Sequence, residues 1–341
     1  MYDVAIIGAG AIGLRAAKLL EGHKVIVIDK ARKIGGHTCS GLYSTNLGKF
    51  IDIKEEWVEN RIKKAVLHSP GGIELVLEKP GTAAYVINRD AMEGWMAGQV
   101  KSEIMLDAEV VDFTVGEHVT LKTTRGTVES KLLIASDGGD SLVARRLDSR
   151  PAELLSGLIA LTDEECHDGH VDLWFDKAAA GDGFLWKIPR GERTEYGIMA
   201  TAAKFSSLEK FFGLKGYEKR FGFITVGPSR KTSFNRILLM GNAAGIVKPW
   251  SGGGIIYGMQ CAGMAASVAS EALKKNRFGE DLLGRFEAGW REAIGKNIEL
   301  GMMFREFYKS ASNKDVDSFF SMLKAGSLDS LDMDFPMLDL G

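Results

Sequence analysis

The sequence has little cysteine, little proline and no excess of charge of one sign. Its 341 residues include 3 Cys, 7 Pro, 43 Lys and Arg, and 45 Asp and Glu. Three cysteines cannot form a disulfide framework, and Cys39, Cys166 and Cys261 lack the paired spacing of zinc or iron–sulfur ligands. A formal charge of −2 offers no basic surface for nucleic acid. We therefore expect a protein of the reducing cytoplasm, with no metal site and no nucleic-acid partner.

Long apolar runs are also missing. No run of about eighteen apolar residues is present, so we expect no membrane-spanning helix. The chain opens on Met-Tyr-Asp-Val, without a basic segment before an apolar stretch, so we expect no secretory signal. Glycine, in contrast, is abundant, with 41 residues. Such abundance favours close approach of the backbone to a bulky ligand.

The first thirty residues predict a strand, a glycine turn, a helix and a second strand. Residues 4–7 are apolar and run into the motif Gly8-x-Gly10-x-x-Gly13, and a second apolar run, 25–28, ends at Asp29. In a dinucleotide-binding unit the glycines permit the turn, the approach of a pyrophosphate and close helix–strand packing. The helix N-terminus there faces the phosphates, and the acidic residue accepts ribose hydroxyls.

The remaining pattern alternates strands with a few helices. We predict a hairpin at 66–77, a helix at 88–100, strands over 104–134, and mostly strands over 154–226 with a helix near 206–221. A short strand at 237–240, a helix at 255–275 and further helices to about residue 324 follow. We expect the tail, 327–341, to be loosely held.

Two later segments repeat the design of a strand that ends in a glycine turn. Residues 133–141 carry Asp137 and Gly138, residues 238–245 carry Gly241 and Asn242, and Pro-Trp-Ser-Gly-Gly-Gly-Ile at 249–255 leads into a helix. Together with the first unit, these segments resemble the FAD fingerprint of the hydroxybenzoate-hydroxylase-like flavoproteins. Residues 35–42 (Gly-Gly-His-Thr-Cys-Ser-Gly-Leu) and 183–191 (Gly-Phe-Leu-Trp-Lys-Ile-Pro-Arg-Gly) are similar to the geranylgeranyl reductase family of isoprenoid lipid enzymes.

The resemblance implies one FAD per chain and a set of residues that bind it. Asp29 would hold the adenosine ribose, Arg89 the phosphates or ribityl chain, and Asn242, where the family usually has Asp, a ribityl hydroxyl. The full set implied is Gly8, Gly10, Ala11, Gly13, Asp29, Lys30, Cys39, Ser40, Gly41, Arg89, Val110, Asp137, Gly138, Gly241, Asn242, Pro249, Gly253, Gly254 and Ile255.

The resemblance also implies a substrate strand and a proton donor. Trp174, Phe184, Trp186 and Pro189 would line an apolar tunnel, although a sheet core explains such residues equally well. Reduction of an isolated alkene needs a proton as well as a hydride, and Cys39 is the candidate donor. A bound water or His37 is the alternative.

We expect an α/β protein with a Rossmann-like FAD-binding domain, an antiparallel-sheet substrate domain and C-terminal helices. The predicted domains are 1–48, 88–150 and 233–275 for FAD, 49–87 and 151–232 for substrate, and 276–341 for the helices and tail. With one dinucleotide fingerprint, the electron donor (NAD(P)H, ferredoxin or a quinol) would bind only transiently.

The activity implied is saturation of C=C bonds in geranylgeranyl or other polyprenyl chains of archaeal-type lipids, with peripheral contact to the cytoplasmic membrane face. Two alternatives stay open. One is a monooxygenase or halogenase of the same superfamily, because a related Trp-x-Ile-Pro pattern occurs in flavin halogenases. The other is a flavoprotein that only carries electrons.

Overall fold

The computed structural model describes residues 1–325, Met333 and Asp334. Contacts divide the chain into two compact units. Unit 1 comprises Met1–His37, Asp90–Leu154 and Thr225–Glu299. Unit 2 comprises Thr38–Arg89, Leu155–Ile224 and the described residues from Leu300 onward. The strands β12 and β16 and the helices α2 and α8 each begin in one unit and end in the other.

Unit 1 contains the predicted strand–turn–helix–strand start and most of the long helices. Its elements are β1 (Tyr2–Ile7), α1 (Ala11–Leu19), β2 (Val25–Ile28), α2 (Arg89–Gly98), β8 (Glu103–Met105), β9 (Val110–Val115), β10 (Val119–Thr123), β11 (Gly126–Ala135), α3 (Leu142–Arg146), β17 (Ser233–Phe234), β18 (Ile237–Leu239), the 3-10 helix η3 (Gly241–Ala244), α6 (Ile255–Lys275), α7 (Glu280–Trp290) and the π-helical turn η4 (Arg291–Gly295).

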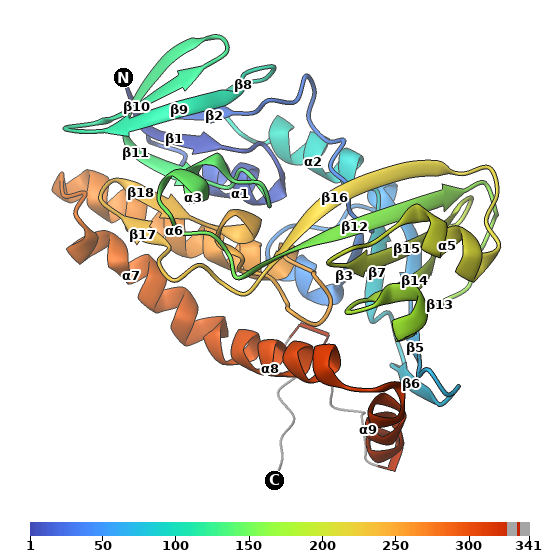
Figure 1. Ribbon diagram of the computed structural model, residues 1–341. Helices are drawn as coiled ribbons and strands as arrows, with labels where there is room; N and C mark the ends of the chain where they lie inside the picture. The colour runs from blue at the N-terminus through green and yellow to red at the C-terminus, as the bar shows by residue number, and fades with distance from the viewer. Residues whose placement is uncertain (326–332, 335–341) are drawn as a thin grey trace. The chain divides into compact units, whose positions relative to one another are not determined.

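These strands form one sheet with a parallel centre (Figure 1). Its order is β17-β18-β11-β1-β2-β8, and the hairpin β9–β10 joins through β11. The pairs β18–β11, β11–β1, β1–β2 and β2–β8 are parallel. The predicted Rossmann-like α/β fold is therefore confirmed.

The carboxyl ends of four neighbouring strands meet at one edge of this sheet. Ile7 pairs with Ile28 on one side and with Ala135 on the other, and Ala135 pairs with Leu239. The residues that follow these ends therefore emerge side by side. In open α/β sheets, ligands bind at this edge.

Two helices pack tightly against each other beneath this edge. A Cβ added to Gly258 in α6 would lie 2.1 Å from Cδ1 of Ile12 in α1, and one added to Gly241 in η3 would lie 2.8 Å from the same atom. The two glycines therefore allow α1, η3 and α6 to meet around one isoleucine. This contact brings the start of α6 toward the turn that follows β1.

Unit 2 contains two further sheets and the last two helices. Its elements are β3 (Leu42–Ser44), the 3-10 helices η1 (Thr45–Lys49) and η2 (Glu55–Trp57), β4 (Val58–Ile62), β5 (Lys64–His68), β6 (Glu74–Glu78), β7 (Ala84–Ile87), β12 (Glu153–Thr162), β13 (His170–Trp174), α4 (Lys177–Ala180), β14 (Phe184–Pro189), β15 (Thr194–Ala200), α5 (Phe205–Phe212), β16 (Glu218–Val226), α8 (Lys296–Ser310) and α9 (Asn313–Ala325).

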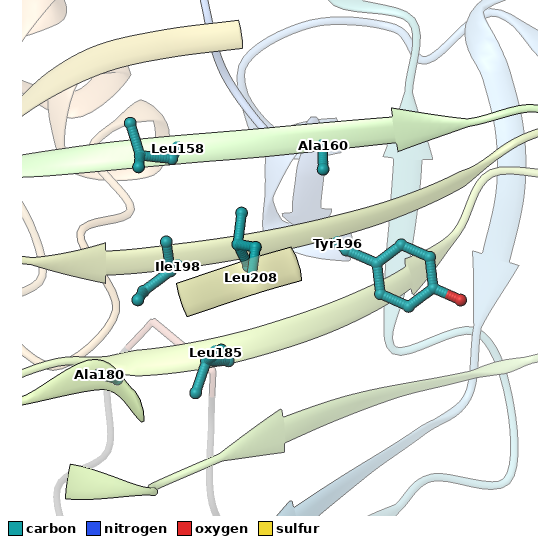
Figure 2. Packing of buried hydrophobic residues seen from close by; sticks show 7 residues of the cluster. All are labelled: Leu158, Ala160, Ala180, Leu185, Tyr196, Ile198 and Leu208. Atoms are coloured by element: carbon teal, nitrogen blue, oxygen red, sulfur yellow. The ribbon is translucent and has the colours of Figure 1, made fainter. Parts of the chain in front are cut away.

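The larger sheet of unit 2 has the order β16-β12-β15-β14-β13-β5-β6. The pairs described by register are antiparallel, apart from β5 with β13. One face is closed by α4 and α5, and Figure 2 shows side chains of β12, β14 and β15 gathered around Leu208 of α5. The smaller sheet has the order β3-β7-β4.

The structure differs from the expected elements at one helix. The helix predicted near 206–221 ends at Phe212, and β16 begins at Glu218. The C-cap, Gly213, has φ +68° and Gly216 has φ +63°. Both values lie in the left-handed region that ends a helix and that glycine enters freely.

The division into units also differs from the predicted domains. Residues 38–48 group with unit 2 because β3 pairs with β7. The region predicted as a separate 276–341 segment divides: α7 packs on α6 and β17, whereas α9 packs on β6. Of the tail 327–341, only Met333 and Asp334 are described, and the buried Asp334 accepts a hydrogen bond from Asn46 at 2.8 Å. The rest of the tail prediction lies outside the described residues.

Candidate functional site

The turn between β1 and α1 accepts only glycine at two of its motif positions. Gly8 has φ +104°, and a Cβ there would lie 2.4 Å from the carbonyl oxygen of Ser136. A Cβ at Gly13 would lie 1.9 Å from the carbonyl oxygen of Gly8. Gly10 is the extended N-cap of α1. The tight turn and the close packing of helix on strand therefore have the geometry of a dinucleotide-binding turn.

Asp29 follows β2 at the same edge and is already fixed in place. Its Oδ2 accepts the N–H of Ala9 at 2.6 Å and its Oδ1 accepts the N–H of Ala31 at 2.7 Å. A carboxylate has about four acceptor positions, so two remain after these bonds. The carboxylate is thus held rigidly while keeping capacity for two hydroxyl groups.

Glu93 of α2 was missed by the sequence reasoning and stands beside this turn. Its carboxylate is fully buried, accepts the N–H of Ala11 at 2.9 Å, and lies 2.9 Å from Nδ1 of His37. The signal was present in the sequence, since Glu93 falls on the apolar face that Met92 and Met96 define in the predicted helix 88–100. His37, the predicted alternative proton source, is therefore engaged by an acidic partner.

Two further strand ends carry buried acceptors that lack a donor among the described residues. They are Oδ1 of Asp137, after β11, and Oδ1 of Asn242, after β18. Burial raises the pKa of the Asp137 carboxyl. A buried acceptor without a donor costs about 1–3 kcal/mol, so two of them at a ligand-binding sheet edge favour a ligand that brings hydroxyl or N–H donors.

The start of α6 completes this group of residues. Gly254 is the N-cap, and a Cβ on it would lie 3.6 Å from Oδ1 of Asn242 and 3.0 Å from Cγ1 of Val247. A Cβ on Gly253 would lie 2.7 Å from Cε of Lys248, which is itself only 4 % exposed. The structure thus brings Asn242 together with the predicted residues Gly253, Gly254 and Ile255. It adds the buried Lys248, which no motif had marked.

The other predicted cofactor residues lie in several different elements. Val110 is buried at the start of β9, Gly138 has φ +82° with open space where a side chain would stand, and Pro249 is buried. Lys30 is exposed. Arg89 begins α2 as the last residue of its segment in unit 2.

The segment that holds Cys39 is the start of unit 2. The Cys39 thiol lies 3.3 Å from the hydroxyl oxygen of the buried Tyr43 and accepts the N–H of Gly41 at 3.5 Å. Gly41 has φ +69°, and a Cβ on it would lie 2.3 Å from the carbonyl oxygen of Ile87. The thiol is therefore held in a turn that is pressed against β7. Tyr43 is its hydrogen-bonding neighbour.

The predicted aromatic residues do not all share one face of the larger sheet. Trp174 pairs with Leu185 and packs in the α5-covered cluster, where it stacks on His68 with ring centroids 4.9 Å apart. Phe184 and Trp186 alternate with Leu185 and have ring centroids 5.7 Å apart. Because side chains alternate across a strand, Trp174 lies on the opposite face from Phe184 and Trp186.

A buried ion pair holds the side chain of Trp186 in place. The indole Nε1 donates to Oε1 of Glu195 at 2.8 Å, and Oε2 of Glu195 accepts from Arg190 at 2.9 Å. Burial opposes the charge of Arg190, but the carboxylates of Glu195 and Glu59 raise the pKa of its guanidinium overall. Sequence reasoning marked Trp186 and Arg190 in their motif but missed Glu195, an acidic residue in an otherwise buried strand.

The segment 165–170, rich in Cys and His, pairs with separate acids. The Cys166 thiol donates to Asp168, His167 pairs with Glu165, and His170 lies 3.4 Å from Asp172. Across residues 1–325, Met333 and Asp334, no group of three or more Cys, His, Asp or Glu side chains has the arrangement of a metal site. In the same part of the chain, no helix is long and apolar enough to cross a bilayer.

Comparisons with known proteins show which proteins this chain is similar to in sequence and in fold. The family described as NAD(P)-binding Rossmann-like domain matches residues 6–46. Digeranylgeranylglycerophospholipid reductase 2 of Methanothermobacter thermautotrophicus is 29 % identical over 360 residues, which cover 97 % of this chain and 94 % of that protein. A geranylgeranyl bacteriochlorophyll reductase-like protein of Thermoplasma acidophilum superposes with a TM-score of 0.89 at 20 % identity, covering 96 % of this chain and 93 % of the other.

A halogenase solved in complex with FAD is a weaker structural match. It has a TM-score of 0.72 at 14 % identity and covers 95 % of this chain and 82 % of its own. These structural matches show the fold, and the sequence match extends over nearly the whole length of both chains. The chain is therefore similar over nearly its whole length to the proteins named digeranylgeranylglycerophospholipid reductase.

Proposed function

We propose that the protein is an FAD-dependent reductase that saturates C=C bonds of geranylgeranyl or related polyprenyl chains in isoprenoid membrane lipids. The observation that carries this proposal is the similarity to digeranylgeranylglycerophospholipid reductases over 97 % of the chain. That span includes both the dinucleotide-binding turn of unit 1 and the aromatic strand of unit 2.

The residues at the sheet edge of unit 1 fit FAD. Asp29 has acceptor capacity for the adenosine ribose. The amides of the first turn of α1, other than that of Ala11, which donates to Glu93, would face a pyrophosphate. The Oδ1 atoms of Asn242 and Asp137, which have no donor in the part of the chain that the structure describes, suit a cofactor with several hydroxyl groups. The N-terminus of α6, a helix of 21 residues, would face the electron-rich part of the flavin ring. When bound, FAD would supply the hydride for the reaction from its reduced form.

Cys39 is proposed to supply the proton. Hydride addition to one carbon of an isolated alkene leaves the electron pair of the C=C bond on the other carbon, so a proton must reach that carbon for the two C–H bonds to form and the C=C bond to be lost. The Cys39 Sγ can release a proton and regain one, with the hydroxyl of Tyr43 at 3.3 Å as a neighbouring group. Phe184 and Trp186 are proposed to hold the prenyl chain by apolar contact, whereas Pro189 falls on the opposite face of β14 by the same alternation.

The Asn242 amide gives a direct test of the cofactor assignment. In Asn242→Ala we expect FAD affinity to fall roughly tenfold, because one hydrogen bond of about 1–1.5 kcal/mol is lost. The unloaded protein should be no less stable, because the substitution also removes a buried acceptor for which the described residues supply no donor. Titration of the unloaded protein with FAD, followed by flavin fluorescence, measures the affinity.

Asn297→Ala is the matched control for that titration. Asn297 also lies in unit 1 and also has a buried Oδ1 without a donor among the described residues. It stands in α8, outside the strand ends. Unchanged FAD affinity in Asn242→Ala, or an equal loss in both variants, would contradict the assignment.

Oxygen distinguishes a reductase from a monooxygenase or halogenase. A monooxygenase or halogenase needs oxygen, whereas saturation of an alkene by hydride and proton does not. We expect chemically reduced holoenzyme to saturate a prenyl lipid in the complete absence of oxygen. Turnover that requires oxygen would favour the alternative class, and passage of electrons to dyes with no prenyl product would favour a simple electron carrier. NAD(P)H, ferredoxin and a quinol remain the candidate donors to be compared in this assay.

We also propose that the protein collects its lipid by peripheral contact with a membrane surface. Three exposed apolar side chains support this: Met303 (69 % exposed) and Phe307 (40 %) on α8, and Met322 (63 %) on α9. The two helices meet there through Phe307 and Phe319, whose ring centroids are 5.4 Å apart. Burial of one large apolar side chain is worth about 1.5–3 kcal/mol, so this group can give reversible binding to a bilayer.

Sedimentation with phosphatidylcholine vesicles tests this contact. The double variant Met303→Ser, Met322→Ser should lose at least about tenfold in vesicle binding. Val111→Ser, which alters a side chain that is 50 % exposed in unit 1, should bind as the original protein does. Equal binding by all three proteins would exclude this surface.

A further inference from the structure

The buried ion pair Arg190–Glu195 connects two segments that the proposed function uses separately. The side chains of Arg190 and Glu195 are only 10 % and 2 % exposed, and their charged atoms lie 2.9 Å apart. An ion pair this deeply buried is weak support for stability, because removing both charges from water costs about as much as the pairing returns. The burial of this ion pair therefore needs an explanation other than stability.

Arg190 holds the backbone of the Cys39 segment. Its Nη1 donates to the carbonyl oxygen of Ser40 and its Nη2 donates to that of Ile87 at 3.5 Å. Gly41 lies so close that a Cβ there would be 3.4 Å from the guanidinium. The rigid planar fork of arginine can serve these two carbonyl groups together with the carboxylates of Glu195 and Glu59, and the Glu59 Oε2 lies 2.6 Å from Nη2.

Glu195 holds the Trp186 side chain by a hydrogen bond, as Arg190 holds the Cys39 segment. One of its oxygens accepts the N–H of Trp186 at 2.8 Å while the other accepts from Arg190. On the neighbouring strand, a Cβ at Gly197 would fall 2.0 Å from the Trp186 ring, so the indole covers that glycine. Trp186, Glu195, Arg190 and Ser40 thus form one continuous hydrogen-bonded chain within unit 2.

We propose that Arg190, oriented by Glu195, is a positioning residue that fixes the Cys39 segment relative to the Trp186 ring. Its consequence for catalysis rests on the proposed function: a prenyl chain packed on Trp186 would then meet the Cys39 thiol in one orientation. The positioning itself needs no substrate and can be measured separately.

The test is the rate at which iodoacetamide alkylates Cys39 in the FAD-loaded protein, mapped by peptide mass spectrometry. Trp186 and Arg190 donate to different oxygens of Glu195. In Glu195→Gln, one of these two positions becomes an NH2 group, which donates and cannot accept, so one of the two hydrogen bonds is lost and the chain is broken. In Arg190→Lys, the charge stays but the fork is lost. Both variants should raise Cys39 alkylation at least about tenfold through local opening of the segment. Alkylation of Cys166 should stay unchanged, and Cys261, whose burial raises its pKa to about 12, should stay unmodified.

Asp182→Asn is the matched control. It breaks another ion pair of unit 2, Arg305–Asp182, which is also buried on the arginine side and has a distance of 2.9 Å. Melting temperatures of all variants are compared, and Asp182→Asn should lose stability without exposing Cys39. Original alkylation rates in both Glu195→Gln and Arg190→Lys would overturn the proposal, as would an equal rise in Asp182→Asn.

Activity then separates this proposal from the proposed function. With a prenyl lipid, Glu195→Gln should lose about tenfold to a hundredfold in kcat with little change in KM, because misplacement of a reacting group lowers rate more than binding. If the unsubstituted protein reduces no prenyl lipid while Glu195→Gln still exposes Cys39, the proposed function fails and the positioning role stands. If the prenyl activity is present but kcat is unchanged in Glu195→Gln, the positioning role in catalysis is wrong.

Discussion

Cys39→Ser should retain FAD with an unchanged absorption spectrum and lose about a hundredfold in prenyl reduction. A positioned general acid contributes about 10²–10⁴-fold, and a serine hydroxyl in the same turn is a far weaker acid than a thiol. Reduction of the bound flavin by the electron donor should stay near the original rate, because that step does not use the proton of Cys39. Stopped-flow absorbance measures donor-driven reduction, and mass spectrometry of the lipid product measures alkene saturation.

Cys166→Ser is the control, since Cys166 is a partly exposed cysteine of the same unit with no proposed role. It should keep full activity. Alkene reduction at the original rate in Cys39→Ser would mean that the thiol serves packing only. The proton would then come from a bound water or from His37, and His37→Gln would be the next variant to measure.

Gly13→Ala should abolish FAD binding and destabilise unit 1 by about 3 kcal/mol or more. The added Cβ would lie 1.9 Å from the carbonyl oxygen of Gly8 and 2.8 Å from the Ser136 hydroxyl oxygen. Because the carbonyl oxygen of Gly8 belongs to the backbone, the steric clash can be removed only if the turn itself moves. Denaturant unfolding and FAD titration give the two measurements.

Gly94→Ala is the matched control within a helix of the same unit. A Cβ at Gly94 would meet nothing within 4 Å, and alanine is a better helix former than glycine by about 1 kcal/mol. This variant should therefore be slightly more stable and bind FAD normally. Normal FAD binding by Gly13→Ala would contradict the assignment of this turn as the cofactor cradle.

The cofactor side of the fold was predictable because its signals are local. Gly8, Gly13 and Asp29 lie within one strand–helix–strand unit, where spacing alone determines what the backbone must do. The strand ends at Asp137 and Asn242 were recognisable for the same reason, since each apolar run stops at a glycine turn. Parallel pairing then places all of these residues at one edge, as the β1, β2, β11 and β18 registers show.

The remaining site residues depend on contacts between distant segments. Glu93 meets the α1 turn across 82 positions of sequence, and Arg190 meets Ser40 across 150. No periodicity encodes such pairings. Trp174 was predicted to line the substrate site because it is aromatic. The register of β13 against β14 instead places its side chain on the sheet face that α5 covers.

Mass spectrometry of lipids from a host that makes unsaturated prenyl lipids, with and without this protein, tests whether it saturates prenyl chains. We expect lipid species heavier by two mass units for each bond reduced, formed only when the protein and an electron donor are present. Cys39→Ser, expressed to the same level, should leave the lipids unsaturated. Oxygenated or halogenated products, or lipids of unchanged mass beside a fully FAD-loaded protein, would contradict the proposed function.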